Sequence, residues 1–265
     1  MKTGGTTLAL HMSREFETAA RFPNEDLDRR HPTDVEAYVS LAALASLPAE
    51  RAAAIRLYAG HFPFMVRDLL PADAVTLTVL REPVDRSISS LKHFKRLYER
   101  YRELSLEEIY EDAFVYRHYV ENHQTKVFAV TARDHPETLA STLTHDEHRA
   151  YLAGTSADLE AGADVPSDTI SVDDARLALA KQRLAEVDVL GVSEEFSDFV
   201  EQLRGRFGWW PEGLSAQARA NVSPESWEAS AALRARIAHD NRFDLELYEH
   251  ARELIAERRG EYDRR

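Results

Sequence analysis

A glycine-containing loop at the start of the chain has the residue types of an oxyanion-binding site. Its residues are Lys2, Thr3, Gly4, Gly5, Thr6 and Thr7. Glycines let backbone N–H groups approach a bound phosphate closely, and the helix expected to follow directs its positive end at the anion. The lysine adds a point charge, and the threonine hydroxyls add short hydrogen-bond donors. The loop therefore predicts binding of a phosphate or a related oxyanion.

The order of residues in this loop differs from that in the phosphate-binding loops of kinases and GTPases. In those loops the lysine follows the glycines, in the pattern Gly-x-x-x-x-Gly-Lys-Ser/Thr. Here Lys2 precedes Gly4 and Gly5. The order argues against an ordinary ATPase.

A second segment with functional residue types follows the apolar run 74–80. The run predicts a buried strand, so Arg81 is expected at its carboxyl end, where open α/β sheets bind ligands. Pro83 suits the first turn of a new helix, and Ser89 falls about two turns into that helix. Arg81 is therefore predicted to lie at the ligand-binding edge of a sheet.

Together, the two segments resemble the nucleotide-binding signatures of sulfotransferases that use 3′-phosphoadenosine 5′-phosphosulfate (PAPS). The matching patterns are Lys-Thr-Gly-Gly-Thr at 2–6 and Arg-x-Pro-x-x-Arg-x-x-Ser at 81–89. The resemblance implies that the first binds the 5′-phosphosulfate and the second the 3′-phosphate. Arg81 would then chelate two phosphate oxygens, and Ser89 would donate one more hydrogen bond.

The form of the first signature looks most like carbohydrate sulfotransferases, including the heparan sulfate 2-O and 6-O enzymes. Weaker matches follow in the order that this family implies, at 60–64, 122–126, 190–196, 221–224 and 241–248. Within them, Asn221 and Ser223 correspond to a late loop that closes over the nucleotide in related enzymes. Asn-x-Ser is also an ordinary turn sequence, so both interpretations of this loop stay open.

His61 is the candidate general base. It follows Gly60 at the predicted carboxyl edge of the sheet, and imidazole accepts a proton near neutral pH. The 2-O-sulfotransferases carry a catalytic histidine in a similar Gly-His segment, but they also have a histidine two positions earlier, where this chain has Ala59. A structural histidine under the loop is the alternative. Lys2 is the second catalytic candidate, because a cation in the loop can offset charge on the leaving phosphate.

Alternating strands and helices predict an α/β fold with a three-layer, P-loop-like parallel sheet flanked by helices. Strands are expected at 56–61, 74–80 and 187–192. Helices are expected at 6–20, 34–46, 84–102, 106–115, 116–130, 171–186 (with Ser171 as its cap), 226–239 and 243–259. In the resembled family a strand and a proline lead into the first loop, and Met1 stands where that proline would be, so the usual first strand is missing from the N-terminus. Either the true start codon lies upstream, which is the expectation favoured here, or this product is a truncated and poorly stable form.

Composition excludes several function classes. The 265 residues carry a formal net charge of −13, which argues against nucleic-acid binding. We find no run of about 18 apolar residues that would predict a membrane span, and a cytoplasmic protein is expected. The length predicts one domain over 1–265, with 131–170 as an irregular insertion. From 81 to 102, seven Lys or Arg residues stand against three acidic ones, as either a solvated helix face or an anion-attracting patch.

The sequence thus predicts a PAPS-dependent sulfotransferase that transfers a sulfuryl group to a hydroxyl of a glycan, a glycoconjugate or a small molecule. PAPS would be the cosubstrate, and no metal is required. A P-loop kinase-like enzyme is the first alternative, although the strand that ends at Leu80 is followed by Arg81 rather than by an acidic residue that holds magnesium. A catalytically silent nucleotide- or glycan-binding module is the second.

Overall fold

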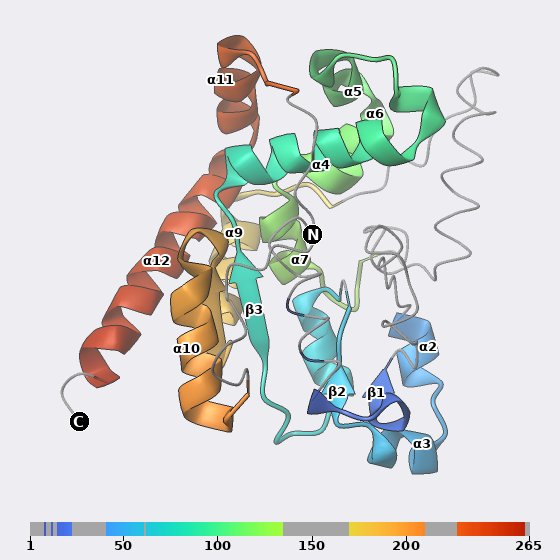
Figure 1. Cartoon of the computed structure of the whole chain (residues 1–265), viewed down its shortest axis with the longest axis vertical. Helices are drawn as coiled ribbons and strands as arrows, with labels where there is room; N and C mark the ends of the chain where they lie inside the picture. The colour runs from blue at the N-terminus through green and yellow to red at the C-terminus, as the bar shows by residue number, and fades with distance from the viewer. Residues whose placement is uncertain are drawn as a thin grey trace.

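The structure of the protein is a computed structural model, which describes residues 8, 12, 15–22, 41–60, 62–134, 170–209 and 227–262. These residues form helices around two short pairs of strands (Figure 1). The fold is therefore of the mixed α/β kind. The single domain predicted over 1–265 and the insertion predicted at 131–170 stay predictions, because most of the insertion lies outside the described residues. None of the described helices is long and apolar enough to cross a membrane.

Both strand pairs are parallel. They consist of β1 (Arg21–Phe22) with β2 (Leu57–Tyr58), and of β3 (Leu77–Leu80) with β4 (Val189–Val192). The strands predicted at 56–61, 74–80 and 187–192 are thereby confirmed, with shorter bounds. β1 was not predicted, because two residues are too few to show the alternating pattern of a strand.

Helices make up most of the described residues. Their bounds are α2 (Leu41–Ala45), α3 (Ala49–Ala54), α4 (Pro83–Leu97), α5 (Leu106–Glu111), α6 (Ala113–Val115), α7 (His123–Ala129), α9 (Asp174–Ala185), α10 (Phe196–Phe207), α11 (Ala231–Asp240) and α12 (Arg242–Tyr262). Short 3₁₀ segments are η1 (Thr18–Ala20), η3 (Phe64–Leu69), η4 (Glu99–Tyr101) and η8 (Ser193–Glu195), and η5 (Tyr116–Val120) is a turn of π-helix. Leu8, Met12 and Glu15 are also helical, as predicted.

The prediction of one helix over 116–130 is wrong at Asn122. This residue has a φ of 44° and separates η5 from α7. Asparagine tolerates the left-handed conformation, and tertiary hydrogen bonds stabilise it here. Its Oδ1 accepts from the backbone N–H groups of Phe243 and Asp244, and its Nδ2 donates to the carbonyl of Asp240. The break therefore depends on the junction of α11 and α12, which lies far away in the sequence.

The capping residue predicted for α9 is also wrong. Asp173, and not Ser171, caps the helix, and its carboxylate accepts a hydrogen bond of 2.8 Å from the backbone N–H of Arg176. The helix therefore begins later than predicted, with an anionic side chain at its positive end. The two helices predicted at the C-terminal end are confirmed as α11 and α12.

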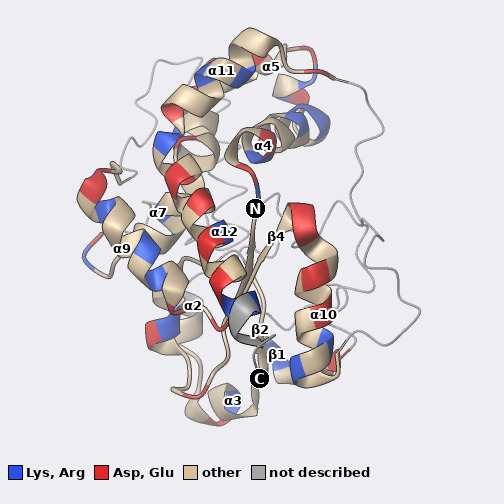
Figure 2. Ribbon diagram, turned by 90° about the vertical axis from the view of Figure 1, so that its left-hand side faces the viewer, with Lys and Arg blue, Asp and Glu red and all other residues tan. Residues whose placement is uncertain are grey.

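The β3–β4 pair buries both of its faces against helices. Val79 and Val189 pack with Phe199 and Leu203 of α10. The neighbouring residues of the strands face the opposite way, where Leu80 and others pack against α7, α9 and α12. Figure 2 shows α10 on one side of these strands and α9 and α12 on the other. This arrangement follows from the alternation of side chains along each strand.

Gly191 allows α10 to lie close to β4. A Cβ atom at this position would come within 2.6 Å of the Phe199 ring. The residues just before the two strands are also joined to each other. The Asp188 carboxylate, before β4, accepts hydrogen bonds of 2.8 Å from both the N–H and the hydroxyl of Thr76, before β3. The close packing of α10 on β4 and these two hydrogen bonds together fix the position of β3, which pairs with β4.

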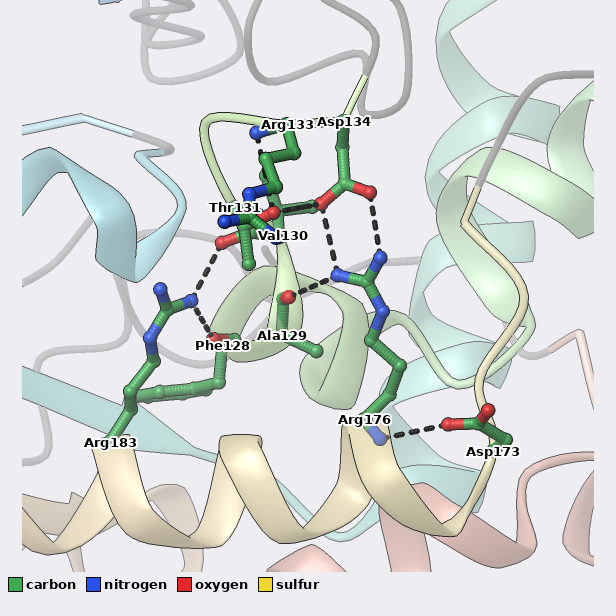
Figure 3. A network of polar contacts seen from close by, with 9 residues as sticks. All are labelled: Phe128, Ala129, Val130, Thr131, Arg133, Asp134, Asp173, Arg176 and Arg183. Carbon is green, nitrogen blue, oxygen red and sulfur yellow. Dashed lines mark hydrogen bonds and ion pairs between the residues drawn. The ribbon is translucent and has the colours of Figure 1, made fainter.

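Side chains of α9 hold the carboxyl end of α7 (Figure 3). Arg183 donates to the carbonyls of Phe128 and Val130, both at 2.6 Å, and Arg176 donates to that of Ala129 at 2.7 Å. Arg176 also forms two hydrogen bonds with the Asp134 carboxylate. Three carbonyls at the end of α7 therefore have charged donors, which α7 cannot supply itself.

Candidate functional site

The carboxyl ends of β3 and β4 meet at one edge of their sheet. Leu80 pairs with Val192, so the chain leaves both strands at the same level. Arg81 follows β3, as predicted, and α4 begins two residues later with Pro83. Arg81 and Glu82 at this edge are half-buried, while Leu80 and Val192, the last residues of the strands, are buried. Open α/β sheets bind ligands at this edge.

The backbone of Arg81 is held by a side chain from α7. The Oε1 atom of Gln124 accepts a hydrogen bond of 3.0 Å from the Arg81 N–H. Its Nε2 atom donates one of 2.9 Å to the Arg81 carbonyl. One buried amide group therefore satisfies both backbone groups of the first residue after the strand.

Glu82, the residue after Arg81, is held by a side chain that lies just after β4. The backbone N–H of Glu82 donates a hydrogen bond of 3.2 Å to Oε1 of Glu194, which lies just after β4. The Tyr248 hydroxyl donates to the other oxygen of the same carboxylate at 2.9 Å. Burial, together with the neighbouring Glu194 charge, raises the pKa of Tyr248. The Glu82 side chain caps α4 by accepting from the N–H of Asp85.

Ser89 differs from its neighbouring serines on α4. Ser87 and Ser90 are buried, and their hydroxyls donate to the carbonyls of Pro83 and Arg86 in the same helix. Ser89 is half-buried. Of these three serines, Ser89 is therefore the one placed to meet a ligand in solvent.

Arg86, the second arginine of the pattern, is inside the protein. Its side chain is only 1% exposed, and its Nη1 atom donates to the Tyr119 carbonyl at 2.8 Å. Burial lowers its pKa to about 10; the Asp244 charge opposes this shift and the Arg81 charge adds to it. Its Nε atom has no hydrogen-bond partner among the described residues. The positive charges of Arg81 and Arg86 therefore act on each other at this edge.

Several other cations of the segment 81–102 have structural contacts. The Lys95 ammonium donates to the carbonyls of Arg102 and Leu104. Arg100 forms an ion pair of 3.0 Å with Asp112. Both interpretations of this basic segment, a solvated helix face and an anion-attracting patch, therefore stay open.

Asp244 holds the amino end of α7. It is 1% exposed, and it accepts hydrogen bonds of 2.7 Å from both the N–H and the hydroxyl of Thr125 and one of 3.1 Å from the N–H of Gln124. Burial raises its pKa, while the Arg86 charge and these N–H groups oppose the shift. Asn241 adds a bond of 2.7 Å from the Asn122 N–H. The C-terminal helices thus fix the helix that carries Gln124.

His123, which precedes Gln124 on α7, is buried. Burial, with the nearby Arg86 charge, lowers its pKa well below the ordinary value. Its Nδ1 atom lies 2.8 Å from the His118 carbonyl, which fixes the ring. A neutral histidine with one nitrogen engaged inside the protein has a structural role.

Most of the predicted site residues lie outside the described residues. These are Lys2, Thr3, Gly4, Gly5, Thr6, Thr7, His61, Asn221 and Ser223. The structure does place Leu8, the residue that follows the loop, against the cluster that contains Val79.

A cavity of about 610 Å³ lies apart from the strand-end residues. It is lined by residues of β2 and β3, by Met12 and Phe16, and by apolar side chains such as Phe64 and Phe128. Arg81 and Ser89 do not line it. Its largely apolar lining does not suit a multiply charged nucleotide.

Sequence reasoning missed the residues that hold Arg81. Gln124 lies in a segment that resembles the sulfotransferase pattern, but a glutamine in a helix gives no signal that its side chain reaches a strand 43 positions away. Asp244 belongs to α12 and is buried. Its capping of a different helix has no sequence signature.

Comparisons with known proteins give no family assignment. No family model, no curated protein and no solved structure matches this chain.

Proposed function

We propose that the protein is a PAPS-dependent sulfotransferase acting on a hydroxyl of a glycan, a glycoconjugate or a small molecule. One observation carries this proposal: the Arg-x-Pro-x-x-Arg-x-x-Ser segment lies at the carboxyl edge of a parallel strand pair, with the Arg81 backbone held on that edge. A fixed arginine at a strand end suits chelation of a phosphate. The mutual influence of the Arg81 and Arg86 charges favours an anion there as well.

The packing of Leu8 supports the participation of the first loop. Leu8 lies against the cluster that includes Val79, which is two residues before Arg81. The loop 2–7 is joined directly to Leu8, so it is tied to the same strand pair as the second segment. Two anion-binding segments on one strand pair suit a nucleotide with phosphates at both ends of its ribose.

The roles of the remaining residues follow from the chemistry of sulfuryl transfer. The S–O bond to the leaving phosphate breaks while a new S–O bond forms to the acceptor oxygen, which loses its proton. In our proposal Lys2 offsets charge on the leaving phosphate, and His61 takes the acceptor proton. Asn221 and Ser223 close over the nucleotide. No step requires a metal.

We also propose that the two strand pairs belong to one three-layer, P-loop-like sheet. Support comes from the parallel direction of both pairs and from the helices on both faces of β3–β4. Residues of both β2 and β3 line one cavity, so the two strand pairs lie close to each other. This arrangement would place the ends of all strands at the edge that contains Arg81.

Nucleotide titration tests the proposal. Calorimetry should show tighter binding of adenosine 3′,5′-bisphosphate than of AMP. Arg81→Ala should weaken bisphosphate binding by about tenfold or more, since a hydrogen bond to a charged group contributes about 1.5–3 kcal/mol. Arg102→Ala is the matched control, because that side chain is 59% exposed in the same segment. Equal affinity of the wild type for the two nucleotides would refute the proposal.

Turnover provides the second part of the test. The protein should transfer sulfate from PAPS to a member of a panel of hydroxyl acceptors. His61→Ala should abolish transfer, a loss of about 10²–10⁴ in rate, while donor binding stays near the wild-type value. Binding of the bisphosphate without transfer to any acceptor would favour a silent nucleotide-binding module instead.

A further inference from the structure

The Gln124 side chain takes the place of a neighbouring strand at the end of β3. In a sheet, a residue bonds to its neighbour through both its N–H and its carbonyl. Here Gln124 bonds to both groups of Arg81, at 3.0 and 2.9 Å, although it belongs to a helix. The side chain is only 2% exposed, so water does not compete for these bonds.

The helix that carries Gln124 is held at both ends. Asp244 accepts from the backbone N–H groups of Gln124 and Thr125 at its beginning. Arg176 and Arg183 bind the carbonyls at its end. The Gln124 amide is therefore presented by a fixed element, which is what precise placement of a binding side chain requires.

We propose that Gln124 is a positioning residue for Arg81 and so sets the preference of the site for a 3′-phosphorylated nucleotide. This inference rests on the proposed function. Arg81 is the first residue beyond the paired strand, and Glu194 holds the backbone N–H of the residue after it. Without Gln124, the Arg81 N–H and carbonyl would lose the hydrogen bonds that fix its backbone, and the guanidinium would no longer be directed at one place. A bidentate contact with phosphate depends on this direction.

Substitution by methionine tests this role. Gln124→Met keeps the length of the side chain and removes both hydrogen bonds to Arg81. We expect the ratio of AMP to bisphosphate dissociation constants to fall by about five- to tenfold, with AMP affinity nearly unchanged. Gln182→Met, the same change at an exposed helix position, should leave the ratio unaltered.

A double-mutant cycle separates positioning from general destabilisation. If Gln124 acts through Arg81, Gln124→Met should change the ratio no further in a protein that already carries Arg81→Ala. Thr125→Val removes a neighbouring buried bond to Asp244 but does not touch Arg81, so it should lower the melting temperature and leave the ratio unchanged. Should Gln124→Met fail to fold, Gln124→Glu keeps the acceptor for the Arg81 N–H, and a smaller loss of about threefold is expected.

The outcomes distinguish this inference from the proposed function. A wild-type protein that binds both nucleotides equally overturns the proposed function and the positioning role together. A wild-type preference that Gln124→Met or Gln124→Glu leaves intact overturns the positioning role alone. The positioning role is also overturned if Gln124→Met lowers the ratio of dissociation constants in the Arg81→Ala protein by the same factor as in the wild type. Gln124 would then act on the fold rather than on Arg81.

Discussion

Loss of the Asp244 carboxylate should strongly destabilise the protein. The variant Asp244→Ala removes the acceptor of three buried hydrogen bonds, two from Thr125 and one from the Gln124 N–H, at 2.7–3.1 Å. It also removes the charge that opposes the shift of the buried Arg86. Removing one member of a buried pair of opposite charges costs about 3–5 kcal/mol. That is a large share of the roughly 5–15 kcal/mol that stabilises a typical protein.

Urea unfolding measures this effect directly. Asp244→Ala should lower the free energy of unfolding by about 3–5 kcal/mol. Asp244→Asn keeps the size of the side chain and part of its acceptor capacity, so a loss of about 1–3 kcal/mol is expected. Asp198→Ala is the control, because its ion pair with Arg259 is about half exposed and contributes under about 1 kcal/mol. A loss for Asp244→Ala no greater than that for Asp198→Ala would refute the reasoning.

Two further variants test the packing and the electrostatics. Gly191→Ala should lower the unfolding free energy by about 1–3 kcal/mol, because its Cβ would lie 2.6 Å from the Phe199 ring; an unchanged urea midpoint would contradict the close packing of α10 on β4. Burial alone would raise the pKa of Asp134, but hydrogen bonds from Arg176 and Thr131 hold its pKa below the ordinary value of an aspartate. The carboxylate therefore stabilises the fold at pH values above that ordinary pKa, and this stabilisation is lost as the pH falls through the lowered pKa. Asp134→Asn should therefore be less stable than the wild type at pH 7, by about 1–3 kcal/mol, and the difference should shrink below about pH 4; a difference that is constant from pH 7 to pH 3 would contradict this.

The elements with strong local signals were predictable from the sequence. The apolar run before Arg81 predicted β3 and placed Arg81 at its end, and the proline at the start of α4 marked the beginning of that helix. Such features depend on periodicity and on backbone restrictions of single residues, which act over a few positions. The oxyanion-binding chemistry of loop 2–7 was likewise inferred from residue types, and it stays a prediction.

Other features were decided by contacts between distant parts of the chain. The left-handed conformation of Asn122, and with it the beginning of α7, depends on hydrogen bonds with residues near the junction of α11 and α12. The burial of Arg86 is a second example, because the same pattern of charges on α4 also fits a fully solvated face.

The sequence by itself determined the parallel α/β elements and the arginine at the end of β3. Only the tertiary structure decided how that arginine is held, because Gln124 reaches its backbone from 43 positions away, and Asp244 holds the backbone of Gln124 from 120 positions away. Local sequence patterns record which backbone conformation each residue prefers. A buried polar side chain needs a hydrogen-bond partner within about 3 Å. Which residue becomes that partner is decided only when the whole chain has packed.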